Sequence, residues 1–172
     1  MRAALIGLIL CCISACGWHL RGQLTAAPAI DQLSIVSAAR HTELLEQIRL
    51  QLDTQDIEAI TTTQAGVYSL SLGKEQTRRR TVGVGSDALA AAYEVTMSLE
   101  YQVFSPSGDM ISDLLRTSVT RSYNYIDNDP SAAAQEETLL AGEMHTDLAQ
   151  QLLRRVYIFI EEHQKRDGQT AP

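Results

Sequence analysis

Three consecutive arginines, Arg78, Arg79 and Arg80, form a group whose type and spacing indicate chemistry. A guanidinium group presents its N–H donors in a fork that matches phosphate and carboxylate oxygens. Successive side chains of a strand point to opposite faces, so we expect Arg78 and Arg80 on one face and Arg79 on the other. The run indicates either an anion contact or charges that protect an edge strand from pairing with other chains.

Cys16 is the second residue with an expected chemical role. Arg2 is followed by about ten apolar residues, which is typical of a secretory leader, whereas a membrane-spanning helix needs roughly 20. Residues 13–15, an aliphatic residue and two small ones, resemble the bacterial lipobox. In such leaders the cysteine thiol is diacylglycerylated, the preceding bond is cleaved and the new amino group is acylated. We therefore expect residues 1–15 to be a lipoprotein signal peptide.

Other roles for the cysteines are considered beside lipidation. Cys11 and Cys12 are rival acylation sites, but the residues before them fit the small-residue rule less well. Cys16 could instead be a buried free thiol or half of a disulfide. Cleavage after residue 15 would leave Cys16 as the single cysteine, so the mature chain could not form an internal disulfide.

The charge of the chain limits its partners. The formal net charge is −7, and it becomes −8 when Arg2 is removed with the leader. An acidic chain does not bind nucleic acid by the usual electrostatic route, nor does it adhere to anionic lipid through its overall charge. Attachment to a membrane must then come from the acyl groups. Two or more acyl chains anchor a protein stably, whereas a single chain anchors it only marginally.

Signatures of catalysis and of metal binding are missing from the sequence. It contains no G-x-S-x-G motif for a hydrolase, and its four histidines do not form a ligand-spaced cluster. The carboxylate pairs at residues 136–137 and 161–162 are typical of a solvated helix face. We therefore assign no catalytic residue, no metal ligand and no cofactor.

Hydrophobic periodicity predicts the elements that would position the arginines. Residues 33–37 are expected to form a strand, residues 42–55 a helix, and residues 67–72 a half-buried strand that continues towards the arginine run. Strict alternation predicts a strand over residues 93–103, which a turn at 105–109 joins to a returning strand over 110–125. A long helix is expected from residue 129 to about 164, with Gly168 ending it.

This order of elements predicts an α+β fold. We expect a two-layer sandwich in which two helices pack on one face of a four-stranded, mostly antiparallel sheet. The other face and the tip of the hairpin should remain exposed. Residues 16–30 are expected to be the lipidated N-terminus and a tether, residues 31–166 a single domain, and residues 167–172 a disordered tail.

Three stretches carry a resemblance to a known family. They are residues 16–22 (CGWHLRG), residues 92–95 (AYEV), and the last helix from Glu143 to Arg155. Together they resemble the LptE family of lipopolysaccharide-assembly lipoproteins. The resemblance implies a non-enzymatic lipoprotein on the periplasmic face of the outer membrane, which plugs the LptD β-barrel in a 1:1 complex and binds lipopolysaccharide. Gly17, where an aspartate would direct retention elsewhere, agrees with sorting to the outer membrane.

One departure from the family concerns the ligand. Family members carry basic residues near the start of the last helix, whereas residues 128–136 contain none. By local chemistry, Arg78, Arg79 and Arg80 are therefore our candidate lipopolysaccharide contacts. Two other functions remain: a generic lipoprotein scaffold of another envelope assembly machine, and an envelope-polymer hydrolase with two carboxylates in a cleft.

Overall fold

The computed structural model describes residues 27–37, 43–84, 90–124 and 130–170. The predicted signal peptide, Cys16 and most of the tether lie outside these residues. The elements run in the order β1 (Gln32–Ser37), α2 (Glu43–Asp53), β2 (Glu58–Ile60), β3 (Ser69–Leu72), β4 (Gln76–Val84), β5 (Ala90–Phe104), β6 (Leu115–Asn124) and α3 (Pro130–Thr170).

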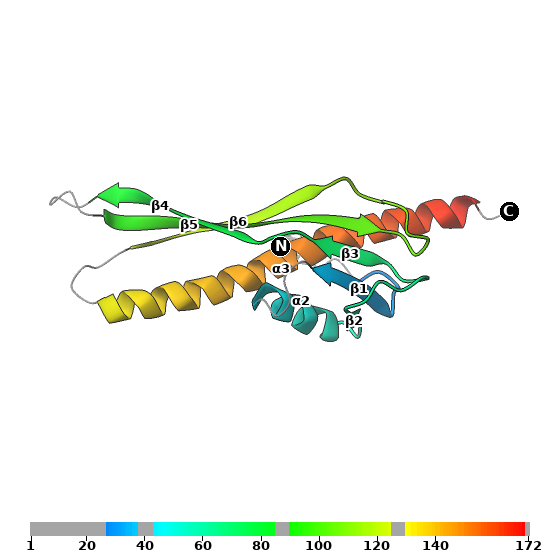
Figure 1. Cartoon of the computed structure of the whole chain (residues 1–172), viewed down its shortest axis with the longest axis horizontal. Coiled ribbons are helices and arrows are strands. Elements are labelled where there is room, and N and C mark those ends of the chain that lie inside the picture. The colour runs from blue at the N-terminus through cyan, green and yellow to red at the C-terminus, as the bar shows by residue number, and fades with distance from the viewer. Residues whose placement is uncertain (1–26, 38–42, 85–89, 125–129, 171–172) are drawn as a thin grey trace, which may run out of the picture.

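The strands form one mixed, curled sheet beneath which both helices lie (Figure 1). β1 pairs in parallel with β2 and with β3. β5 pairs antiparallel with β3, β4 and β6. The expected α+β fold with two helices on one sheet face is therefore confirmed.

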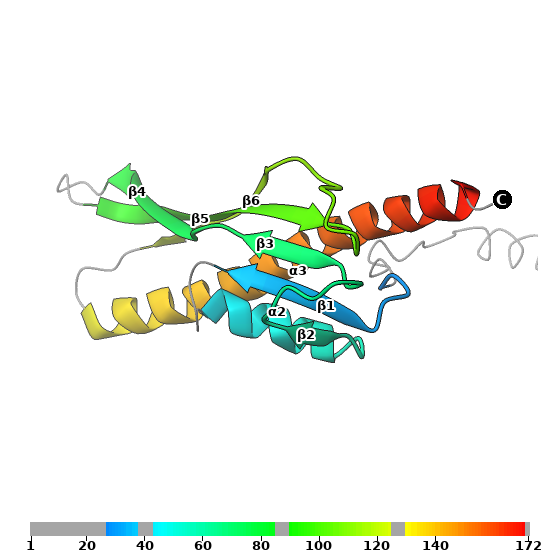
Figure 2. The same cartoon turned by 45° about the vertical axis from the view of Figure 1, so that its right-hand side comes forward.

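β5 is the backbone of the sheet. Its residues 101–104 pair with β3 and its residues 90–98 pair with β4, so β3 and β4 follow one another along the same edge of β5. β6 pairs with the opposite edge of β5 over residues 92–101. Figure 2 shows the resulting long ribbon of β4, β5 and β6, which extends beyond the part of the sheet that contains β1 and β2.

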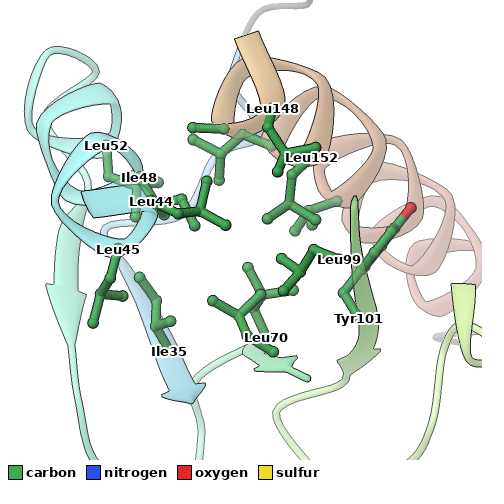
Figure 3. Close-up of a cluster of buried hydrophobic side chains, with 14 of the residues drawn as sticks. Ile35, Leu44, Leu45, Ile48, Leu52, Leu70, Leu99, Tyr101, Leu148 and Leu152 are labelled. Carbon is green, nitrogen blue, oxygen red and sulfur yellow. The ribbon is translucent and has the colours of Figure 1, made fainter. Parts of the chain in front are cut away.

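The core lies between the sheet and the two helices (Figure 3). α2 contributes apolar residues at the three- and four-residue spacing of one helix face, and α3 contributes a longer stripe with the same spacing. Inward residues of the strands alternate with outward ones. Buried members include Leu44, Ile48 and Leu52 of α2, Leu148 and Leu152 of α3, and Ile35, Leu70, Leu99 and Tyr101 of the sheet.

The predicted number of strands is wrong. The sheet has six strands because β2 was not expected and because the single strand predicted through the arginine run is two strands, β3 and β4. β2 is three residues long, too short to give a periodic signal. Gly73 separates β3 from β4 where the chain passes close to β5: a Cβ there would lie 3.2 Å from the carbonyl oxygen of Glu100.

The ends of the predicted hairpin and helix also differ. The prediction that Gly168 ends the last helix is wrong, because α3 continues to Thr170 and takes in residues 167–170 of the expected tail. The tip of the turn at 105–109 is exposed at residues 107–109, as expected, but the start of the turn is held against the chain. The Gly66 N–H donates to the Pro106 carbonyl at 3.1 Å, and Ser105 is buried.

No helix within the described residues is both long and apolar enough to cross a membrane.

Candidate anion-binding groove

A one-residue irregularity between β3 and β4 decides where the arginines point. Leu72 pairs with Tyr101, whereas Gln76 pairs with Ser98. Between these two pairs the β3–β4 segment contains four residue steps, from 72 to 76, whereas β5 contains only three, from 101 to 98. Because side chains alternate with period two, the extra residue exchanges the inner and outer faces of everything that follows.

The arginines consequently divide between the two faces. Arg79 lies opposite Val95, an inward residue of β5, so its side chain is on the helix side. Arg78 and Arg80 lie opposite Thr96 and Glu94, on the face that no helix covers. The expected alternation of the run is confirmed.

A groove of about 790 Å³ lies on the uncovered face. It runs across β4, β5 and β6, and several of its polar side chains are hydroxyls, among them those of Thr96, Ser98 and Ser118. Four cations and two carboxylates line it, which leaves a positive surplus within an acidic chain. The cations are Lys74, Arg78, Arg80 and Arg116, and the carboxylates are Glu75 and Glu94.

Two of the four cations are held by carboxylates of the central strand. Arg80 Nε donates to Glu94 Oε1 at 2.7 Å, and Arg116 Nη2 donates to Glu100 Oε1 at 2.8 Å. The hydrogen bond from Arg80 lowers the pKa of Glu94 and raises the pKa of Arg80 itself. These cross-strand pairs fix both guanidinium groups over the sheet, at positions where an anion would meet them.

Arg78 and Lys74 differ from these two because neither forms an ion pair with another described residue. Both line the groove. A phosphate or carboxylate entering it would meet these charges without having to displace a carboxylate from the described part of the chain. Arg78 is therefore the side chain of the run best placed to bind an anion.

Arg79 has a different set of contacts. Its Nη1 lies 3.4 Å from Glu137 Oε2 of α3, and its guanidinium carbon lies 4.9 Å from the centre of the Tyr93 ring. A hydrogen bond with Tyr123 and the charge of Glu137 raise the pKa of Arg79. The structure thus joins Arg79 to α3 and separates it from the groove.

Sequence reasoning did not find Lys74 and Arg116 as parts of the site. Arg116 is far from the run in sequence and reaches the groove because β6 pairs with β5, opposite the edge that β4 occupies. The signal that could have indicated Arg116 is the alternation of polar residues along β6, which places Arg116 and Ser118 on the same outward face. Among the described residues, no three histidine, cysteine or acidic side chains gather to hold a metal ion.

The fold is that of several small bacterial lipoproteins. A lipoprotein B from Nitrosomonas europaea superposes with a TM-score of 0.69 at 20% identity, over 84% of this chain and 93% of that one. The rare lipoprotein B of Shewanella oneidensis superposes with a TM-score of 0.63 at 21% identity, over 80% of this chain and 97% of that one. At these identities the likeness concerns the fold.

Sequence comparison then gives the family. The family model LptE, described as lipopolysaccharide-assembly, matches residues 30–156. The LPS-assembly lipoprotein LptE of Photorhabdus laumondii is 30% identical over 154 residues, which cover 88% of this chain and 82% of the relative. That of Pectobacterium atrosepticum is 29% identical with the same coverage. This chain belongs to the LptE family.

Membership of the family confirms two expectations. The suspected resemblance is correct, and the chain is a lipopolysaccharide-assembly lipoprotein of the cell envelope and not an enzyme. An envelope-polymer hydrolase is therefore excluded by the family to which the chain belongs.

Proposed function

We propose that this chain is a lipid-anchored subunit of the outer membrane that plugs an LptD-type β-barrel in a 1:1 complex, assists its assembly and binds lipopolysaccharide during delivery to the outer leaflet. Cys16 carries the acyl anchor, and the domain faces the periplasm. The family supports the setting, because its curated members are LPS-assembly lipoproteins.

The observation that carries the ligand assignment is the positive groove on the uncovered sheet face. Lipopolysaccharide carries phosphates and acidic sugars, and the net negative charge of the chain does not attract it. At physiological salt, charges farther away than a Debye length of about 8 Å are largely screened. Contact must then be local. Arg78 and Arg80, with Lys74 and Arg116, supply the local charge, and the neighbouring hydroxyls suit a sugar surface.

Binding of purified lipopolysaccharide at low salt tests this assignment. Replacing Arg78 and Arg80 together with alanine should weaken binding by at least about tenfold, since a hydrogen bond to a charged group contributes roughly 1.5–3 kcal/mol. Replacing both with glutamate should weaken it further, because repulsion adds to the lost contacts.

The matched control is Arg154→Glu, a charge reversal at an exposed position of α3. It should leave lipopolysaccharide binding within about twofold of the wild type, because weak screened charges at a distance contribute little. If the Arg78 and Arg80 variants bind as the wild type does, the arginine run protects an edge strand and the ligand lies elsewhere.

The barrel partnership is tested by co-purification from outer membranes. An affinity-tagged chain should retain an LptD-type β-barrel in equal amount. Isolation of the chain with another envelope machine in place of that barrel would support the generic scaffold instead.

A further inference from the structure

A second hollow lies on the other side of β4, between the sheet and α3. It is a cavity of about 160 Å³ whose walls are mainly apolar. Val95, Met97 and Met144 are buried. The apolar side chains that line it are Val95 and Met97 of β5 and Leu140, Ala141 and Met144 of α3.

Polar side chains also line the cavity. His145 Nε2 lies 3.0 Å from Glu75 Oε1, and both side chains line the hollow. Glu137, the partner of Arg79, lines it as well. An apolar chamber lined in part by charged groups is suited to a ligand that is itself half apolar and half charged.

The cavity and the groove are neighbours around the start of β4. Glu75 and Thr77 line both hollows. β4 has no strand on its outer edge among the described residues, so no described strand covers this edge between the two sheet faces. The extra residue between β3 and β4 lies at the same place, where the pairing with β5 is interrupted.

We propose that these two hollows form one binding site for an anionic amphiphile, with the anionic group in the groove and the end of a hydrocarbon chain in the cavity. The inference rests on the proposed function, in which the amphiphile is lipopolysaccharide and the hydrocarbon is one of its acyl chains. It adds that this protein recognises the apolar part of the ligand through α3 and β5.

The size of the cavity sets how much chain it holds. A dry apolar cavity of about 150 Å³ accommodates benzene, so this one has room for about six carbons. Each methylene transferred from water to an apolar site is worth about fourfold in affinity. Met97 and Met144 are flexible side chains that can adapt to a chain end.

Methyl NMR with short alkyl phosphates tests the proposal. The mature protein, held in phosphatidylcholine nanodiscs with labelled methionine methyls, is titrated with octyl phosphate and with inorganic phosphate. Octyl phosphate should shift the methyl signals of Met97 and Met144, and inorganic phosphate should not. Met110, which is 68% exposed, is the internal control and should remain unchanged.

A cavity-filling variant provides the second measurement. Ala141→Leu places three carbons in the cavity and should weaken octyl phosphate binding at least tenfold while leaving the affinity for inorganic phosphate unchanged. Ala134→Leu, the same change at an exposed position of α3, should alter neither. If Ala141→Leu does not fold, Leu140→Phe replaces it, because Leu140 lines the cavity and not the groove.

The outcomes separate this inference from the proposed function. Unchanged Met97 and Met144 signals, or wild-type binding of octyl phosphate by Ala141→Leu, would overturn the cavity assignment. If octyl phosphate enters the cavity while lipopolysaccharide binds equally well without Arg78 and Arg80, the cavity holds a hydrocarbon chain, but the proposed headgroup contacts and the joining of the two hollows into one site are wrong.

Discussion

Gln76 lies opposite Ser98 on β5, although continuation of the pairing between Leu72 and Tyr101 would put Glu75 there. This displacement by one residue sends Arg78 and Arg80 to the open face. Without it, both guanidinium groups would face α3 and the core, where an unpaired charge is costly. The groove therefore depends on a backbone irregularity as much as on the arginines.

Deleting Lys74 tests the role of this irregularity. Removal of one residue between β3 and β4 either strains the chain or turns Arg78 and Arg80 towards α3, and we expect the free energy of unfolding to fall by more than about 2 kcal/mol. Urea denaturation measures the change. Deleting Gln64, which is exposed in a loop, is the control and should cost less. Equal effects of the two deletions would contradict the importance of the register.

Arg79 should contribute to the fastening of α3 and not to ligand binding. Arg79→Ala removes contacts with Glu137 and the Tyr93 ring, so amide hydrogen exchange in residues 134–143 should become faster. Because the pair is half-exposed, global stability should fall by less than about 1 kcal/mol. Lipopolysaccharide binding should stay within twofold of the wild type, and a loss as large as that of the Arg78 and Arg80 variants would show that the inner face takes part.

The sequence predicted helices and strands correctly where a hydrophobic pattern repeats over many residues. Alternation over residues 93–103 and the stripe of apolar residues in the last helix predicted β5 and the core of α3, because burial on one face imposes a period on many residues. Alternation also predicted that Arg79 would be separated from Arg78 and Arg80. It did not say which face was which, since one inserted residue reverses that assignment and leaves no periodic trace.

Long-range pairing explains the remaining misses. Lys74 and Arg116 come together with the arginine run because β4 and β6 pair with opposite edges of β5, and nothing local to either residue specifies this neighbour. β1 and β2 pair in parallel, and α2 connects the two strands along the chain. A three-residue strand is below the length at which periodicity can be recognised.

Lipidation of Cys16 is a prediction from the leader. Mass spectrometry of the native protein should find an N-terminal peptide that begins at Cys16 and is heavier by a diacylglycerol and an acyl chain. Cys16→Ala should prevent lipidation and cleavage of the leader, whereas Cys12→Ala should prevent neither. An unmodified thiol at residue 16, or lipid on Cys11 or Cys12, would contradict the assignment.

The core between α2, α3 and the sheet should dominate stability. Leu148 is fully buried, so Leu148→Ala should lower the free energy of unfolding by about 2–5 kcal/mol through lost burial and a new cavity. Leu139→Ala makes the same change at a position that is 72% exposed, and it should cost less than about 1 kcal/mol. Denaturant unfolding of both variants measures the contrast, and similar costs would contradict this placement of the core.

Tyr157 should make the folded protein sensitive to alkali. Its side chain is buried in α3 and its hydroxyl has no hydrogen-bond partner among the described residues, and this burial raises its pKa to about 12. An unfolded tyrosine has a pKa of about 10. Between these values the folded state retains a proton that the unfolded state has lost. The contribution of Tyr157 to stability is therefore complete below about pH 10 and is lost as the pH rises towards 12, at up to about 1.4 kcal/mol per pH unit.

Tyr157→Phe isolates this contribution. At pH 7 the variant should be as stable as the wild type or more stable by up to about 1 kcal/mol, because a buried hydroxyl without a partner is removed. Above pH 10 its free energy of unfolding should fall less steeply, although some decline remains since burial also raises the pKa of Tyr68 and of Tyr101. Urea unfolding at a series of pH values gives both slopes. Identical slopes for variant and wild type would mean that the Tyr157 hydroxyl is hydrated in the folded protein.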